Sequence, residues 1–161
     1  MSIVWGSLAG GFVGTIALTT GLRAAQELGW TRMDLPLLVG TAFSPNRSRA
    51  TVIGYALHFV NGLIFSLGYA AIFLAVGHEG AGFGAGLGLA HGLVSGGPLV
   101  TAVLPAIHPR MGTPWSDSEE TPLLEPPGFL LRNYGRHTAV VTLASHIAYG
   151  VLVGWFAADL S

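Results

Sequence analysis

Three of the six histidines lie where an ionisable side chain is unusual. His58, His91 and His146 each fall inside a long segment free of Asp, Glu, Lys and Arg. In a lipid bilayer such a side chain is unfavourable, so it normally faces the protein interior and often marks a functional site. At about 1.5 Å of rise per residue, the three rings lie roughly 10 to 18 Å from the loop-side ends of their helices. We therefore expect the imidazoles to meet at a similar depth.

Other polar side chains share helix faces with these histidines. Asn61 follows His58, Ser95 follows His91 and Tyr149 follows His146, each at a spacing of about one helical turn. Polar groups left unpaired in hydrocarbon are unfavourable, so these faces should point at one another. The predicted binding site has six members: His58, Asn61, His91, Ser95, His146 and Tyr149.

Several functions remain open for this set. The three imidazoles could ligate a transition metal, or the metal of a haem or chlorin, with facing glycines making room for a flat macrocycle. They could relay protons or line a solute path, or bond the carbonyl oxygens of a quinone. They could also only hold helices together by hydrogen bonds. No His-x-x-x-His spacing, membrane-embedded carboxylate or nucleophilic triad can be found in the sequence, which argues against an enzyme.

The composition predicts helices that cross a membrane. Only 9% of the 161 residues are charged and 51% are apolar, whereas soluble domains have about a quarter charged. Four uncharged segments reach the about 20 residues that span a bilayer. We predict an all-α fold, a four-helix transmembrane bundle that forms a single integral-membrane domain over residues 1–161. The expected spans are residues 3–25, 51–77, 80–104 and 137–158, with a long proline-rich loop between the third and fourth.

Glycine recurs at every fourth position in two of the segments. The third segment has Gly80, Gly84, Gly88, Gly92 and Gly96, and the first has Gly6, Gly10 and Gly14. Small residues at this spacing let another helix approach closely. These stripes offer more close-packing surface than four short helices need among themselves. We therefore expect association with other membrane subunits or self-association within the lipid bilayer.

The basic residues predict an orientation. All seven are arginines, and all fall in or beside the two loops that lie on one face of a four-span protein. The positive-inside rule places these loops in the cytoplasm and both termini outside the cytoplasm. Four arginines are expected to contact lipid headgroups or a small anion: Arg32, Arg110, Arg132 and Arg136. A net charge of −1 predicts no nucleic-acid partner, and the absence of a basic N-terminal region argues against a cleaved signal peptide.

Five short strings give the chain a resemblance to other proteins. They are TRMDLP at 31–36, HFVNG at 58–62, HPRM at 108–111, EPPGF at 125–129 and NYG at 133–135. Together they resemble an uncharacterised family of small bacterial polytopic inner-membrane proteins, over residues 30 to 150. The resemblance implies a bacterial inner (plasma) membrane and implies no activity or site residue.

These observations lead to one main expectation. We expect a non-catalytic membrane subunit, or a partner-associating bundle, whose interior histidines could hold a haem, a chlorin or a metal. The alternative is an oligomeric small-solute or proton transporter or channel in which the histidines line the path.

Overall fold

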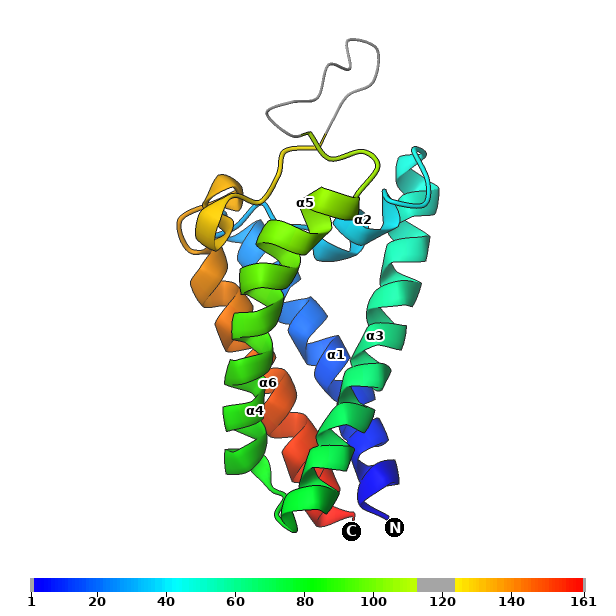
Figure 1. Cartoon of the computed structure of the whole chain (residues 1–161), viewed down its shortest axis with the longest axis vertical. Helices are drawn as coiled ribbons and strands as arrows, with labels where there is room; N and C mark the ends of the chain where they lie inside the picture. Colours follow the sequence, from blue (N-terminus) through cyan, green and yellow to red (C-terminus); the bar gives the residue numbers. More distant parts are fainter. Residues whose placement is uncertain (1, 113–123, 161) are drawn as a thin grey trace.

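The fold of the described residues is helical. The computed structural model describes residues 2–112 and 124–160 (Figure 1). Four helices are long and apolar enough to cross a membrane: α1 (Ile3–Glu27), α3 (Arg47–Val76), the continuous run Ala81–Ile107, and α6 (Thr138–Asp159). The prediction of an all-α chain with four long apolar helices is therefore confirmed for this part of the chain. These helices indicate a membrane protein.

The third long helix is not regular. It consists of α4 (Ala81–Val94), η1 (Ser95–Val103), which has π-helical hydrogen bonds, and α5 (Leu104–Ile107). Within η1, Gly97 has non-helical angles of φ −88° and ψ −113°, and Pro98 follows it. Proline lacks a backbone N–H and crowds the preceding turn, which disrupts the α-helical ladder. The helix nevertheless continues past the predicted end at residue 104.

The second long helix begins earlier than predicted. It starts at Arg47 rather than residue 51 because Asn46 caps it, with its side-chain oxygen accepting from the Arg49 N–H at 3.0 Å. Such a cap satisfies one of the free N–H groups in the first turn. The sequence-based boundary excluded Arg47 and Arg49 only because they are charged.

A short helix, α2 (Leu35–Gly40), lies across the loop end of α3. Asp34 caps it by accepting from the Leu37 N–H at 3.0 Å. A Cβ atom added at Gly54 would collide with the carbonyl of Pro36, so α2 rests directly on the backbone of α3. Figure 1 shows α2 lying crosswise near α5, at the end opposite the two termini.

Helix α6 packs between α1 and α4, and glycine lies on both sides of it. A Cβ added at Gly10 of α1 would lie 2.8 Å from Val153 Cα, and one at Gly88 of α4 would lie 2.9 Å from Ile147 Cα. Both distances are shorter than real Cβ contacts. The glycine faces of α1 and α4 are thus occupied by contacts within this chain.

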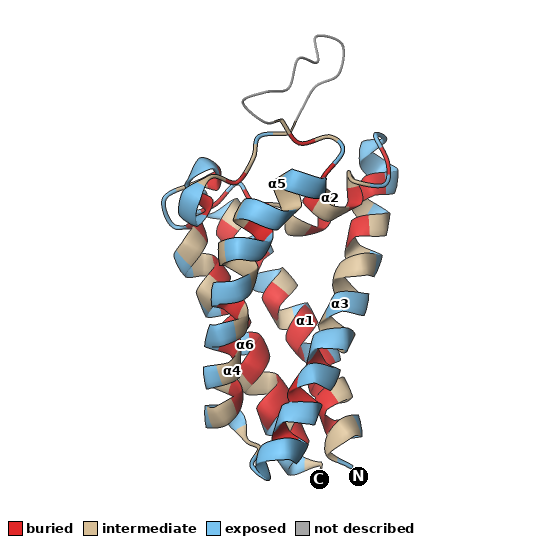
Figure 2. Ribbon diagram, viewed as in Figure 1, coloured by how far each residue is buried: buried red, intermediate tan, exposed pale blue. Residues whose placement is uncertain are grey.

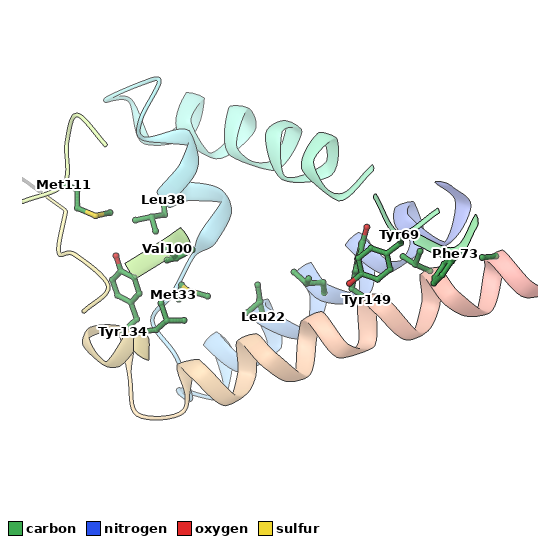
Figure 3. Packing of buried hydrophobic residues seen from close by; sticks show 13 residues of the cluster. Leu22, Met33, Leu38, Tyr69, Phe73, Val100, Met111, Tyr134 and Tyr149 are labelled. Atoms are coloured by element: carbon green, nitrogen blue, oxygen red, sulfur yellow. The ribbon is translucent and has the colours of Figure 1, made fainter. Parts of the chain in front are cut away.

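Burial follows the inner faces of the long helices (Figure 2). Large apolar side chains such as Trp5, Ile64, Leu93 and Val140 are exposed on the outer faces, as expected for residues that meet lipid. Figure 3 shows the buried apolar residues with Tyr69, Phe73 and Tyr149 near one end of the structure. A second group, which includes Leu38, Val100, Met111 and Tyr134, lies near the other end.

The two termini lie together at one end of the molecule (Figure 1). The opposite end carries α2, α5 and η2 (Phe129–Tyr134), and the arginines lie in the adjoining helix ends and connections. The middle of the expected proline-rich loop, residues 113–123, lies outside the described residues. On its flanks, the Leu124 N–H donates to the Arg110 carbonyl at 2.8 Å and the Gly112 N–H donates to the Leu124 carbonyl at 2.9 Å.

Candidate functional site

A cavity of about 170 Å³ lies among the helices, and we call it the histidine cavity. Residues of α1, α2, α3, α4, η1, α5 and α6 line it. All six residues of the predicted site are among them: His58, Asn61, His91, Ser95, His146 and Tyr149. The structure therefore brings the predicted residues to one place, although their function as ligand contacts stays a prediction.

The imidazoles of His91 and His146 are in contact. Their ring centroids lie 4.7 Å apart with the planes at 80°. Phe65 of α3 packs on His91 with centroids 4.0 Å apart, and the Tyr69 hydroxyl lies 3.4 Å from His91 Nδ1. These rings join α3, α4 and α6 at the floor of the cavity.

The hydrogen bond of His146 determines which of its nitrogens carries the proton. Its Nδ1 lies 2.8 Å from the carbonyl oxygen of Thr142, one turn earlier in α6. A carbonyl oxygen can only accept, so Nδ1 is the donor and carries hydrogen. In the neutral ring, Nε2 is then an acceptor.

Three other polar side chains of the cavity have no hydrogen-bond partner among residues 2–112 and 124–160. The Nε2 atom of His58 is buried without one. The side chains of Asn61 and Ser95 also make no hydrogen bond within the described chain. Buried polar groups are almost always paired. Of these three side chains only His58 has a buried unpaired atom, because Asn61 is exposed and Ser95 is half-buried. His58 is therefore the side chain of the cavity whose missing partner needs an explanation.

Tyr149 lines the same cavity, but its hydroxyl is already hydrogen-bonded and its side chain is buried. Its hydroxyl donates to the carbonyl of Gly62 at 2.5 Å, joining α6 to α3, and its side chain is 1% exposed. Because the donor hydrogen is already used, Tyr149 contributes to the wall of the cavity and to helix packing.

The described residues do not form a metal-ligand set. Among them, no three His, Asp or Glu side chains are arranged to hold a metal ion. The predicted set of His58, His91 and His146 lines one cavity without converging on one point.

A haem or chlorin also does not fit the cavity as it stands. Its volume of about 170 Å³ is close to the about 150 Å³ of an apolar cavity that binds a single benzene ring. A macrocycle contains four pyrrole rings and needs several times that space. The enclosed space therefore holds about one ring, and a larger group would have to extend through the side that opens outward.

The remaining walls of the cavity are apolar. Leu35 and Val39 of α2 cover its loop end, and Leu99, Val103 and Ile107 line it from η1 and α5. Leu99 is 41% exposed and Ile107 72% exposed. These residues both line the cavity and reach the outer surface, so the cavity opens sideways, toward the region where lipid would lie. The apolar cover formed by α2 was not predicted from the sequence.

Two of the four arginines predicted to meet headgroups have partners inside the protein. Arg32 donates to the Asn133 carbonyl at 2.5 Å and lies 3.3 Å from the Glu125 carboxylate. Arg110 donates to the carbonyl of Thr41 at 2.5 Å. Arg132 and Arg136 are exposed, and their side chains form no ion pair or hydrogen bond with the described residues.

Tyr134 of η2 is a titratable group outside the long helices, and its environment shifts its pKa. Its hydroxyl donates to the Glu125 carbonyl at 2.6 Å. Burial raises its pKa to about 12, and the negative charge of Glu125 adds to this, whereas Arg32 opposes it. Tyr134 therefore stays a neutral donor that links η2 to the segment around Glu125.

In comparisons with known proteins, no protein-family model, no curated protein and no solved structure matches this chain.

Proposed function

We propose that this protein is a non-catalytic membrane protein that takes a small lipid-soluble molecule from the bilayer into the histidine cavity. The observation that carries the proposal concerns His58, whose side chain lines the cavity and whose buried Nε2 atom has no partner within the described chain. A buried polar atom without a partner destabilises the fold by about 1–3 kcal/mol. A bound molecule with hydrogen-bonding groups would remove that penalty.

The shape of the cavity favours an amphiphilic ligand. Its polar groups lie on α3, α4, α6 and the first residue of η1, whereas the exposed residues Leu99, Val103 and Ile107 give it an apolar stretch of wall that reaches the outer surface. A molecule with one polar ring and an apolar tail can satisfy both regions at once. Binding sites of this kind combine mostly apolar walls with a few placed polar groups.

We place the protein in the inner membrane of a bacterium, with the arginine-bearing loops in the cytoplasm. The asymmetry of the arginines supports this orientation. Association with other subunits stays part of the proposal, but the glycine faces no longer argue for it, because α6 covers those of α1 and α4. Arg132 and Arg136 are the arginines available for headgroups.

The transporter alternative has less support. A path for protons or solutes would have to continue from the histidines toward the end that carries the termini. Tyr69 and Phe73 are buried in that direction, and Phe73 packs on Phe83 with ring centroids 5.9 Å apart. The described arrangement thus favours a binding site over a path that continues through the molecule.

The proposal can be tested by filling the cavity. We would measure binding of 4-pentylphenol to the protein in lipid nanodiscs by calorimetry, with empty nanodiscs as the blank. Leu99→Trp places a large ring in the cavity wall, and Leu93→Trp places the same ring on an exposed position of the same long helix that does not line the cavity. Saturable binding that is lost in Leu99→Trp and kept in Leu93→Trp is expected. Equal binding by both variants, or no saturable binding by the wild type, would overturn the proposal.

A further inference from the structure

We infer that the ligand of the histidine cavity is an aromatic alcohol, a phenol or quinol head group on an apolar tail, which donates its O–H to His146 Nε2. This inference rests on the proposed function and specifies its ligand. A ring that carries only acceptor oxygens, such as an aryl ether or an oxidised quinone, would bind less well.

The first step is the tautomer of His146. Thr142 offers a carbonyl oxygen 2.8 Å from Nδ1, and this contact places the ring hydrogen on Nδ1. The nitrogen that remains for a ligand is Nε2, with a lone pair and no hydrogen. Only a molecule that donates hydrogen can pair with it.

The second step is that the two tyrosine hydroxyls beside the histidines are already used. The Tyr149 hydroxyl donates to Gly62, and the Tyr69 hydroxyl pairs with Nδ1 of His91. The ring of His91 itself meets His146 in an edge-to-face contact rather than a hydrogen bond. Within the described chain, no side chain donates a hydrogen bond to His146 Nε2, so this nitrogen is available to a ligand that carries an O–H.

The third step concerns the opposite wall. His58 and Asn61 line the cavity from α3, and neither has a hydrogen-bond partner among the described residues. A second oxygen on the ring, as in a quinol, would find an amide or imidazole there. The hydroxyl that meets His146 remains the group on which the inference depends.

The fourth step is size and direction. About 170 Å³ suits a single six-membered ring with small substituents. The exposed apolar wall of Leu99, Val103 and Ile107 gives the tail a route out of the cavity. A ring with a chain attached opposite its hydroxyl can therefore enter head first and leave its tail among lipid chains.

The test compares two probes that differ only in the donor. We would titrate 4-pentylphenol and its methyl ether, 4-pentylanisole, into the protein in nanodiscs. Leaving the acceptor of His146 unpaired should weaken binding of the ether by about tenfold, which corresponds to about 1.4 kcal/mol. In His146→Leu the two probes should bind alike, whereas His78→Leu, an exposed histidine outside the cavity, should keep the preference.

A measurement on the wild type makes the test independent of variant folding. In ¹⁵N spectra of histidine-labelled protein, His146 should show a protonated Nδ1 and an unprotonated Nε2. Nε2 should then shift on addition of the phenol and stay unchanged with the ether. Equal affinity for the two probes, or a protonated Nε2 in the free protein, would overturn the inference. If both probes bind equally at a site that Leu99→Trp blocks, the proposed function stands and only the ligand class is wrong.

Discussion

The Nε2 atom of His108 lies 3.0 Å from the carbonyl oxygen of Leu38 and donates to it across a sequence separation of 70 residues. The donor assignment follows from the other nitrogen, because His108 Nδ1 accepts from the Arg110 N–H at 3.1 Å. Arg110 also bonds the carbonyl of Thr41, just after α2. The segment that follows α5 therefore holds α2 in place over the histidine cavity.

Replacing His108 should loosen this cover. His108→Ala removes the hydrogen bond to the Leu38 carbonyl, which keeps only the Thr41 hydroxyl as a side-chain donor, and leaves the Arg110 N–H without its acceptor. The change falls at a place where His108 is only 5% exposed. We expect a loss of about 1–3 kcal/mol in the free energy of unfolding, measured in mixed micelles, and faster release of 4-pentylphenol. His137→Ala changes an exposed histidine and should leave both quantities near their wild-type values. Unchanged release in His108→Ala would show that α2 does not cover the ligand.

Glycines of α4 should differ sharply in their tolerance to alanine. A Cβ at Gly88 would lie 2.9 Å from Ile147 Cα, which is backbone and cannot move aside cheaply, whereas a Cβ at Gly86 would meet nothing within 4 Å. Gly88→Ala should destabilise the protein by about 1–3 kcal/mol through overpacking. Gly86→Ala should be neutral or stabilising by up to about 1 kcal/mol because alanine is the better helix former. Equal unfolding free energies for the two variants would contradict the α4–α6 packing.

Much of the candidate site could be predicted from the sequence because lipid leaves few options for polar groups. His58, His91 and His146 lie in uncharged segments, and a helix has only one face that can turn polar side chains away from hydrocarbon. The spacing of these histidines relative to Asn61 and Ser95 was therefore enough to predict that all five residues line one cavity. The four long helices followed from composition for the same reason.

Other features depend on contacts that periodicity does not encode. A glycine stripe shows which face of a helix is narrow but not which helix meets it, so the central position of α6 was not foreseen. The expected partner association was inferred from glycines that α6 covers within the chain. Likewise, the number of arginines does not show whether each one contacts a lipid headgroup or a backbone carbonyl. Arg32 and Arg110 both donate to backbone carbonyls.

Three consecutive residues in the sequence could have predicted the irregular turn of η1. Gly96-Gly97-Pro98 combines two flexible residues with one that lacks an N–H, and the non-helical angles fall at Gly97. No pattern in the sequence indicates which nitrogen of His146 carries the proton, because that depends on the distance from Nδ1 to the Thr142 carbonyl oxygen.

Tyr149 should prove to be a packing residue rather than a ligand contact. Tyr149→Phe removes the hydrogen bond to the Gly62 carbonyl and keeps the buried ring. We expect the free energy of unfolding to fall by about 1 kcal/mol, while the preference for 4-pentylphenol over 4-pentylanisole stays as in the wild type. A loss of that preference in Tyr149→Phe would mean that the phenol bonds Tyr149 instead of His146.

Tyr134 should make the stability of the protein fall at alkaline pH. Burial, followed by the charge of Glu125, raises the pKa of Tyr134 in the folded protein from 10.0 to about 12, with Arg32 acting in the opposite direction. Between these values the unfolded chain releases the phenol proton and the folded protein keeps it, so unfolding is favoured as the pH rises. The stabilisation is fully present below pH 10 and is lost by about pH 12. Unfolding free energies measured from pH 8 to pH 12 should therefore decline more steeply for the wild type than for Tyr134→Phe.

Below pH 10, Tyr134→Phe should itself be less stable by about 1 kcal/mol, because the hydrogen bond to the Glu125 carbonyl is lost. Parallel profiles for the wild type and Tyr134→Phe would show that Tyr134 is not held in a buried, neutral state.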